Sequence, residues 1–138
     1  MEQTIEDFLN TLSEAERAGG RVLHELVPLA RSAELRELLK KVGHDEGYYA
    51  GELSAHVRRP GGQPSNKTGD FVDKVRAVEI FKDKLALLNR GQRWVMRKIE
   101  ETLPSIADAE LQGFLVVMKD GHQTNIRALE EALQNGAA

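Results

Sequence analysis

The sequence contains no cysteine, and this excludes several kinds of site at once. Disulfides, thiolate zinc sites, iron–sulfur clusters and cysteine nucleophiles all need a residue that the chain lacks. The absence of cysteine also fits a reducing compartment, so we expect a cytoplasmic protein. The opening stretch MEQTIEDFLN is acidic and lacks the basic start and apolar run of a signal peptide. No apolar run approaches the roughly 20 residues that span a bilayer, so we expect no membrane partner.

Aromatic residues and positive charge are also scarce. Aromatic residues make up 5% of the 138 residues, and the net charge is −3. Basic residues gather between Arg58 and Lys98, where 11 Lys and Arg stand against 4 Asp and Glu. Because the total charge is negative and aromatic residues are few, we expect acidic helices to neutralise this segment and expect no nucleic-acid partner. The length predicts a single domain over residues 1–138.

Apolar residues recur every three or four positions along almost the whole chain, which predicts an all-α protein. Four helices are expected, at about residues 4–27, 33–57, 70–102 and 108–134. Ser32 is the expected N-cap of the second helix, and Ser105 or Asp108 that of the fourth. Short connections join the first two helices and the last two, so each pair is expected to form an antiparallel hairpin.

The connection between the second and third helices is much longer than a hairpin needs. The stretch RRPGGQPSNKTG, at about residues 58–69, holds two prolines and three glycines and predicts a loop. Such a loop reaches about 45 Å when extended, and a 25-residue helix is about 38 Å long. The loop is therefore expected to cross the length of the bundle and to start the third helix parallel to the second. A simple up-down bundle with a slack loop is the alternative.

Polar residues interrupt the apolar stripe of each expected helix near its middle. Because the middles of the helices face one another in a four-helix bundle, these interruptions predict one buried polar layer. Its expected members are Glu16, Asp45 or Glu46, Tyr49, Asn89, Gln92, His122 and Asn125. A buried carboxylate must be neutral, paired or bound to a cation. In a purely structural layer, Glu16 would be neutralised by arginines nearby in the sequence, namely Arg17, Arg21, Arg90 and Arg93.

Glycines accompany the polar residues at the same level of each helix. They are Gly19 and Gly20, Gly43 and Gly47, Gly91, and Gly121. A glycine inside a helix costs about 1 kcal/mol relative to alanine, so its presence needs a reason. One reason is that glycine makes room for a bulky polar side chain, a neighbouring helix or a bound ligand. The alternative is close backbone packing without any ligand.

One stretch from each expected helix carries a resemblance to a known group of proteins. ERAGGRVL, HDEGYYAGEL, LNRGQRWV and MKDGHQTNI resemble an uncharacterised family of short bacterial ferritin-like proteins. The resemblance implies a ferritin-like four-helix bundle over essentially the whole chain, with two hairpins joined by the long crossover. It brings no established activity.

The ferritin-like resemblance also implies where metal ligands would lie. In that superfamily two helices each supply a Glu and the other two each supply Glu-x-x-His. Glu16, Asp45 or Glu46, and His122 match this pattern. The departures are Tyr48 or Tyr49 in place of a His, Gln92 or Asn89 in place of a Glu, and Lys119 in place of the Glu before His122. The implied di-metal site is therefore degenerate, and one iron, manganese or zinc ion on Glu16, Glu46 and His122 is the implied alternative.

Three functions follow from these features, and whether the chain is an enzyme stays open. The favoured one is binding of a small molecule or partner at the polar layer. The alternatives are a metal-binding ferritin-like oxidoreductase or metal-handling protein, and a scaffold held by an arginine–carboxylate network. A homodimer is a reasonable expectation for the fold. Beside Trp94, one helical face carries Arg90, Arg93 and Arg97 and is expected to bind an anion or partner, or to pair with acidic residues of a neighbouring helix.

Overall fold

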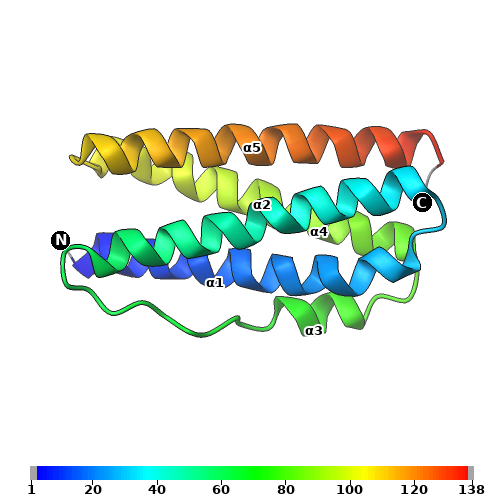
Figure 1. Cartoon of the computed structure of the whole chain (residues 1–138), viewed down its shortest axis with the longest axis horizontal. Coiled ribbons are helices and arrows are strands. Elements are labelled where there is room, and N and C mark those ends of the chain that lie inside the picture. Colours follow the sequence, from blue (N-terminus) through cyan, green and yellow to red (C-terminus); the bar gives the residue numbers. More distant parts are fainter. Residues whose placement is uncertain (1–2, 137–138) are drawn as a thin grey trace.

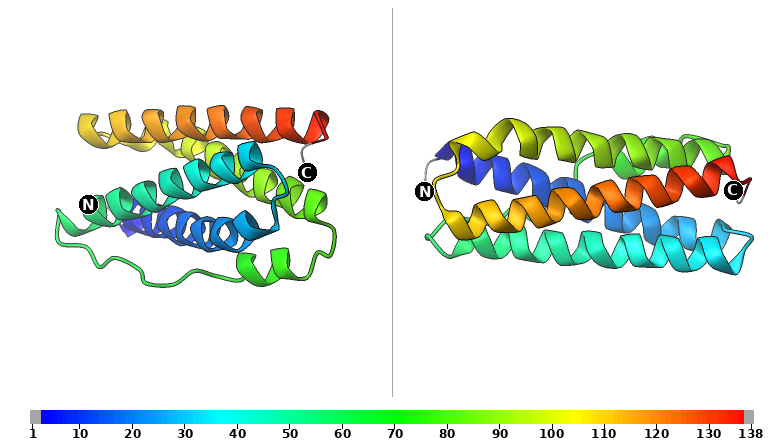
Figure 2. Two further views of the ribbon diagram at one scale, coloured as in Figure 1. Left: turned by 45° about the vertical axis from the view of Figure 1, so that its right-hand side comes forward. Right: turned by 90° about the horizontal axis from the view of Figure 1, so that it is seen from above.

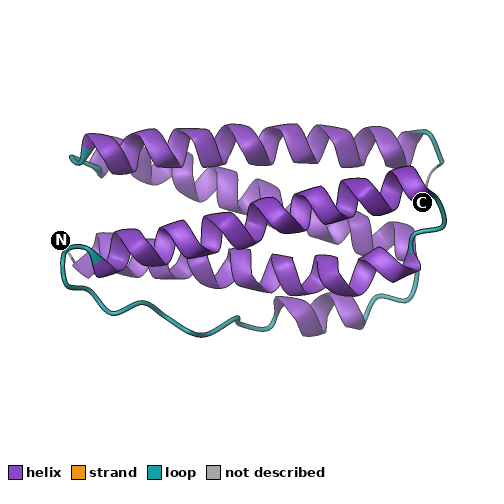
Figure 3. Cartoon of the chain, viewed as in Figure 1, coloured by secondary structure: helices purple, strands orange, loops and turns teal. Residues whose placement is uncertain are grey.

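Four long helices and one short helix make up the structure, a computed structural model that describes residues 3–136 (Figure 1). The helices are α1 (Gln3–Leu26), α2 (Ala33–Arg58), α3 (Phe71–Arg76), α4 (Phe81–Thr102) and α5 (Ala109–Gln134). Short 3₁₀ turns follow α1 (Val27–Leu29) and α4 (Leu103–Ser105). Over the described residues the chain forms no strand, as the colouring by secondary structure in Figure 3 shows. The all-α prediction is confirmed.

The starts of α2 and α5 follow from the predicted capping residues. The hydroxyl oxygen of Ser32 accepts a hydrogen bond from the backbone N–H of Leu35 at 3.1 Å. The carboxylate of Asp108 accepts from the backbone N–H of Glu110 at 2.9 Å. Each cap satisfies a donor that the first turn of a helix leaves free. The choice between Ser105 and Asp108 is thereby settled in favour of Asp108.

The chain forms two antiparallel hairpins, α1–α2 and α4–α5, joined by a crossover (Figures 1 and 2). The crossover segment, residues 59–70, runs the length of the bundle, so α4 begins at the same end as α2 and runs parallel to it. In cross-section α1 contacts α2 and α4, and α5 contacts the same two helices. This is the crossover arrangement expected from the loop length, and the up-down alternative is wrong.

Polar tethers hold the crossover segment against α1. Asn10 accepts a hydrogen bond from the backbone N–H of Ser65 at 2.8 Å, and the hydroxyl of Ser65 donates to Glu14 at 2.6 Å. One turn further along α1, Arg17 donates to the backbone carbonyl of Ser65 at 3.0 Å and to that of Lys67. No residue between 59 and 70 is buried. The segment is therefore placed by hydrogen bonds and not by an apolar core.

The prediction of one helix over residues 70–102 is wrong, because the structure divides it into α3 and α4. The break covers residues 77–80, and Ile80 has an extended backbone with φ −84° and ψ 125°. A helix of the predicted length would be about 50 Å long. The other long helices have only 24 or 26 residues, so it would project beyond the bundle. The break instead lets Val72 and Val75 of α3 join the apolar core.

The buried apolar side chains form two clusters, one toward each end of the bundle. The first cluster includes Leu23, Leu39, Val42, Leu85 and Leu129. The second includes Leu12, Leu53, Ile99, Leu115 and Met118. Between them lie the central turns of all four long helices. None of the described helices combines the length and hydropathy needed to cross a membrane.

Candidate metal centre

The predicted polar layer exists and occupies the space between the two apolar clusters. Its buried members are Glu16 from α1, Glu46 and Tyr49 from α2, Asn89 and Gln92 from α4, and His122 and Asn125 from α5. Asp45 belongs to its edge, because its half-buried carboxylate faces Lys41 at 3.0 Å and accepts from the Asn125 amide at 3.0 Å. The open choice on α2 is therefore settled: Glu46 is the buried carboxylate, and placing Asp45 within the layer was wrong.

Three titratable side chains meet at the centre of this layer. Glu16, Glu46 and His122 expose 1%, 3% and 0% of their surfaces, and each offers a ligand atom within 4.8 Å of the others. The His122 Nε2 atom lies 2.9 Å from Glu16 Oε1. We call these three residues the triad. Among the described residues it is the one group of three or more such side chains positioned to share a cation.

A hydrogen-bonded chain fixes the orientation of the His122 ring. The amide nitrogen of Asn89 donates to the backbone carbonyl of Ile126 at 3.3 Å, and this carbonyl can only accept. Asn89 Oδ1 in turn accepts from Gln92 Nε2 at 3.0 Å. Gln92 therefore presents its oxygen to His122 Nδ1, 2.9 Å away, and Nδ1 must carry a hydrogen.

The consequence falls on the other ring nitrogen. A neutral His122 with its hydrogen on Nδ1 points a lone pair from Nε2 at the Glu16 carboxylate. Two lone pairs 2.9 Å apart need either a proton or a cation to hold them together. Metal-binding histidines are commonly oriented in this way, with the second nitrogen donating to a carbonyl oxygen.

Both carboxylates of the triad carry an oxygen without a partner. Glu16 Oε2 and Glu46 Oε2 are buried and accept no hydrogen bond. Burial raises the pKa of Glu46 well above its usual range, and the negative charges of Glu16 and Asp45 add to the rise. Leaving such oxygens unpaired is expensive, because burial removes the water that would otherwise solvate them. A cation would satisfy both oxygens together.

Two of the glycines are explained by the polar layer. A methyl group at Gly19 would lie 2.4 Å from Glu46 Oε2, so only glycine leaves the carboxylate its position. A methyl group at Gly121 would lie 2.0 Å from the hydroxyl oxygen of Tyr49. Gly20 and Gly47 differ, since a methyl group there would meet no atom within 4 Å. The prediction that glycine makes room for a polar side chain is confirmed at Gly19 and Gly121, whereas no described side chain fills the space at Gly20 or Gly47.

Tyr49 forms one wall of the triad. The centre of its ring lies 5.5 Å from that of His122. Burial raises the pKa of Tyr49 to about 12, with smaller contributions from the charges of Asp45 and Glu16. The phenol is therefore neutral at physiological pH, and its ring shields His122 from solvent.

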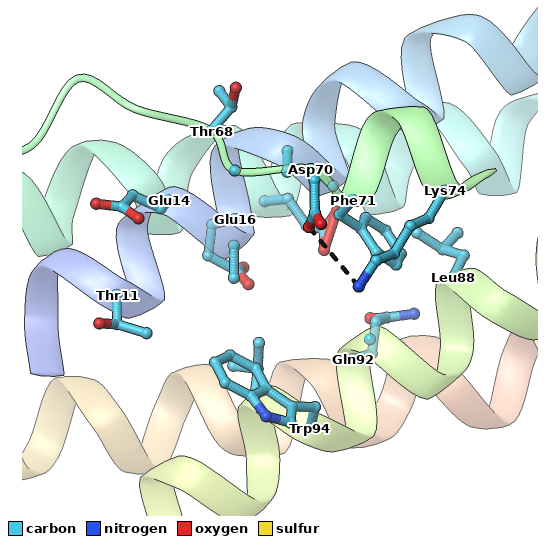
Figure 4. Close-up of a pocket in the computed structure, with 17 residues that line it drawn as sticks. Thr11, Glu14, Glu16, Thr68, Asp70, Phe71, Lys74, Leu88, Gln92 and Trp94 are labelled. Carbon is cyan, nitrogen blue, oxygen red and sulfur yellow. Dashed lines mark ion pairs between the residues drawn. The ribbon is translucent and has the colours of Figure 1, made fainter. Parts of the chain in front are cut away.

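A cavity of about 380 Å³ reaches the triad from the side of the crossover segment. Glu16 and Glu46 line it at the centre of the bundle, and Phe71, Lys74 and Trp94 line it further out (Figure 4). Sequence reasoning missed these outer wall residues. The tethers of the crossover segment place α3 beside α1. The apolar repeat along each helix gives no sign of this contact.

The arginines proposed as partners of Glu16 include two that bind elsewhere. Arg17 donates to the backbone of the crossover segment. Arg93 forms an ion pair with Glu130 across α4 and α5, which is the pairing with a neighbouring helix that the sequence suggested. The polar contact that the structure gives Glu16 is the one to His122.

The residues present fit one cation and do not fit two. Two atoms bound to one cation at about 2.1 Å lie at most about 4.2 Å apart. The triad atoms lie within 4.8 Å of one another, so one cation shared by all three needs only a small movement, for which the unpartnered Oε2 of Glu46 is available. A second cation would need further carboxylates, but Gln92 and Asn89 supply neutral amides that are already engaged with each other.

Comparison with known proteins adds a family but no activity. Residues 3–131 match a family described as a domain of unknown function, DUF6306. The chain belongs to this family. No curated protein and no solved structure matches it. For this DUF6306 domain the geometry of the triad and its cavity is therefore the basis for assigning a function.

Proposed function

We propose that this chain holds one divalent transition-metal cation on Glu16, Glu46 and His122 and presents it to a small molecule in the adjoining cavity. The observation that carries the proposal is the pair of unpaired, buried carboxylate oxygens beside an imidazole nitrogen. The hydrogen-bonded chain through Gln92 directs the lone pair of that nitrogen toward them. Such a set of converging oxygen and nitrogen atoms is what a cation needs.

The proposal includes a ferritin-like origin for the bundle. It is supported by the crossover between two hairpins and by the central position of the triad, with ligands from α1, α2 and α5. The loss of carboxylates on α4 reduces a two-metal pattern to one cation. An oxidoreductase and a metal-handling protein both fall within this proposal. A metal-handling protein would exchange its bound cation during function, whereas an oxidoreductase would retain it.

The chemistry of the donors narrows the cation. Imidazole together with carboxylate suits iron, manganese and zinc. When bound, such a cation supplies Lewis acidity and, for iron or manganese, a change of oxidation state. The chain's own residues hold the ligands in place: Gln92 orients His122, and Gly19 leaves space for Glu46. Three protein ligands leave a coordination position free, as in catalytic sites.

Metal analysis of protein purified without chelator tests the proposal. We expect about one equivalent of iron, manganese or zinc per chain. Glu16→Ala and His122→Ala are each expected to abolish binding. Circular dichroism checks that each variant still folds.

Gly19→Ala is the sharper variant, because it removes no ligand atom and instead displaces the Glu46 carboxylate. Gly20→Ala is its matched control, since the added methyl meets no atom within 4 Å. We expect loss of metal in the first and retention in the second. Protein that stays metal-free after incubation with ferrous iron, manganese and zinc would overturn the proposal.

A further inference from the structure

We propose that the cavity beside the triad takes an uncharged nitrogen-donor ligand with a flat apolar body, that is, a small aromatic N-heterocycle. The inference rests on the proposed metal site and names the class of molecule that the cavity presents to it. The cavity, its aromatic walls and its charge each contribute to the argument.

The position of the cavity makes it the open side of the triad. Glu16 and Glu46 line it, whereas His122 does not. Gly19 and Gly91 also line it, so two helices approach it without side chains. A ligand in the cavity therefore meets the two carboxylates from the side away from the imidazole. A cation held there would face the ligand with its free coordination position.

The walls of the cavity favour a flat apolar body. Leu88 and Val95 supply apolar surface, and Phe71 and Trp94 supply aromatic rings. In Figure 4 these two rings lie on opposite sides of the space beside Glu16. The volume of about 380 Å³ is near the lower end of the range for small-molecule pockets, which suits a body of one or two rings. Aromatic walls stack well against a planar ring.

The charge of the site disfavours anions. A divalent cation and the two triad carboxylates sum to zero, so an anionic ligand would leave one buried negative charge without a partner. Lys74 is the only basic residue among the described residues that line the cavity. Its ammonium lies 3.7 Å from the Asp70 carboxylate and is paired with it. Glu14 adds a further acidic group to the lining.

The same charges decide which uncharged donor fits best. An aliphatic amine is protonated at neutral pH and has no lone pair for a metal. A heterocyclic nitrogen of the imidazole type is largely unprotonated above about pH 7 and is a strong ligand for these cations. An N-heterocycle combines this donor with the planar body that Phe71 and Trp94 accommodate.

Cobalt(II)-loaded protein tests the inference, because the visible absorption of cobalt(II) reports each new ligand. The probes are imidazole, benzimidazole and azide, added at about pH 8, where imidazole is uncharged. We expect both heterocycles to shift the cobalt spectrum and azide to leave it unchanged. Benzimidazole should bind about tenfold more tightly than imidazole, because its second ring buries additional apolar surface.

Two variants assign the binding to the cavity. Trp94→Ala should remove the advantage of benzimidazole and leave the affinity for imidazole unchanged. Phe71→Leu, a milder change on the opposite wall, should reduce the difference in affinity between benzimidazole and imidazole. This variant tests the cavity even if Trp94→Ala does not fold. Lys40→Gln, at an exposed position of α2 outside the cavity lining, is the matched control and should change neither affinity.

The outcomes separate this inference from the proposed function. If cobalt binds but neither heterocycle alters its spectrum, the inference is overturned and the metal site stands. If azide binds as tightly as imidazole, the preference for an uncharged ligand is wrong. If cobalt fails to bind at all, both proposals fall.

Discussion

The same four helices bury apolar side chains at the two ends of the bundle and polar side chains in its middle. At the ends, leucine, valine and isoleucine side chains fill the space between helices without a polar atom to satisfy. In the middle, two carboxylates, an imidazole and three amides occupy an equally buried layer. The ends contribute hydrophobic stabilisation, while the middle requires desolvation of charged groups.

Hydrophobic burial accounts for the two ends of the bundle but does not account for the polar layer. A layer of leucines at the same level would pack as the ends do and would leave no oxygen unpaired. The chain instead places glycine at Gly19 and Gly121 to accommodate the polar side chains, at about 1 kcal/mol of helix propensity each. An arrangement that costs helix propensity and brings together three side chains able to hold a cation is consistent with the proposed binding.

Truncating a leucine at either end is expected to have the largest effect on stability. Leu85 and Leu115, one from each apolar cluster, are fully buried. Leu85→Ala and Leu115→Ala should each lower the free energy of unfolding of the metal-free protein by about 2–5 kcal/mol, because each leaves a cavity. Denaturant unfolding measures the loss. Both variants should still bind one equivalent of metal, and loss of metal from either one would show that the ends and the middle are not independent.

Gly121→Ala is expected to have an intermediate effect, because it brings a methyl group against the Tyr49 hydroxyl. The buried phenol ring cannot turn aside freely, so the free energy of unfolding should fall by about 1–3 kcal/mol. Gly113→Ala, on the exposed face of the same helix, is the matched control. There the methyl meets no atom within 4 Å, and stability should rise by about 0.5–1 kcal/mol. Thermal unfolding of the two variants side by side gives the difference, and equal melting temperatures would contradict the packing role of Gly121.

Much of this arrangement could be predicted from the sequence, because the polar layer interrupts regular apolar stripes. Glu16, Gln92 and His122 stand where an apolar residue is due, and their buried positions follow from helical periodicity alone. The same periodicity could not separate Asp45 from Glu46. The two are neighbours on α2, and a rotation of the helix by part of a turn decides which one is buried.

The parts that could not be predicted depend on contacts between distant segments. Phe71, Val75, Val78 and Phe81 recur every three or four residues across the break between α3 and α4, so the sequence reads as one helix. The break is imposed from outside, by the length of the bundle and by the packing of α3 against α1. The part of the outer wall that α3 supplies, Phe71 and Lys74, escapes prediction for the same reason, since hydrogen bonds between α1 and the crossover segment hold that segment in place.

The most gradual effect concerns the pH dependence of stability, and Glu46 determines its sign. Its pKa is raised in the folded protein above the ordinary value of 4.5, so the folded state binds this proton more tightly than the unfolded state does. The stabilisation is complete below about pH 4.5 and is lost as the pH rises toward the folded pKa, by at most about 1.4 kcal/mol per pH unit. Chelator-treated protein should therefore lose stability over this range relative to Glu46→Gln, which keeps the shape and cannot ionise. Glu37→Gln, at an exposed position of the same helix, should retain the slope of the unaltered chain. Denaturant unfolding of the three proteins at several pH values provides the measurement. If Glu46→Gln shows the same slope as the unaltered chain, the buried carboxyl does not cause it, and the contrast between the middle and the ends then concerns packing and hydrogen bonding alone.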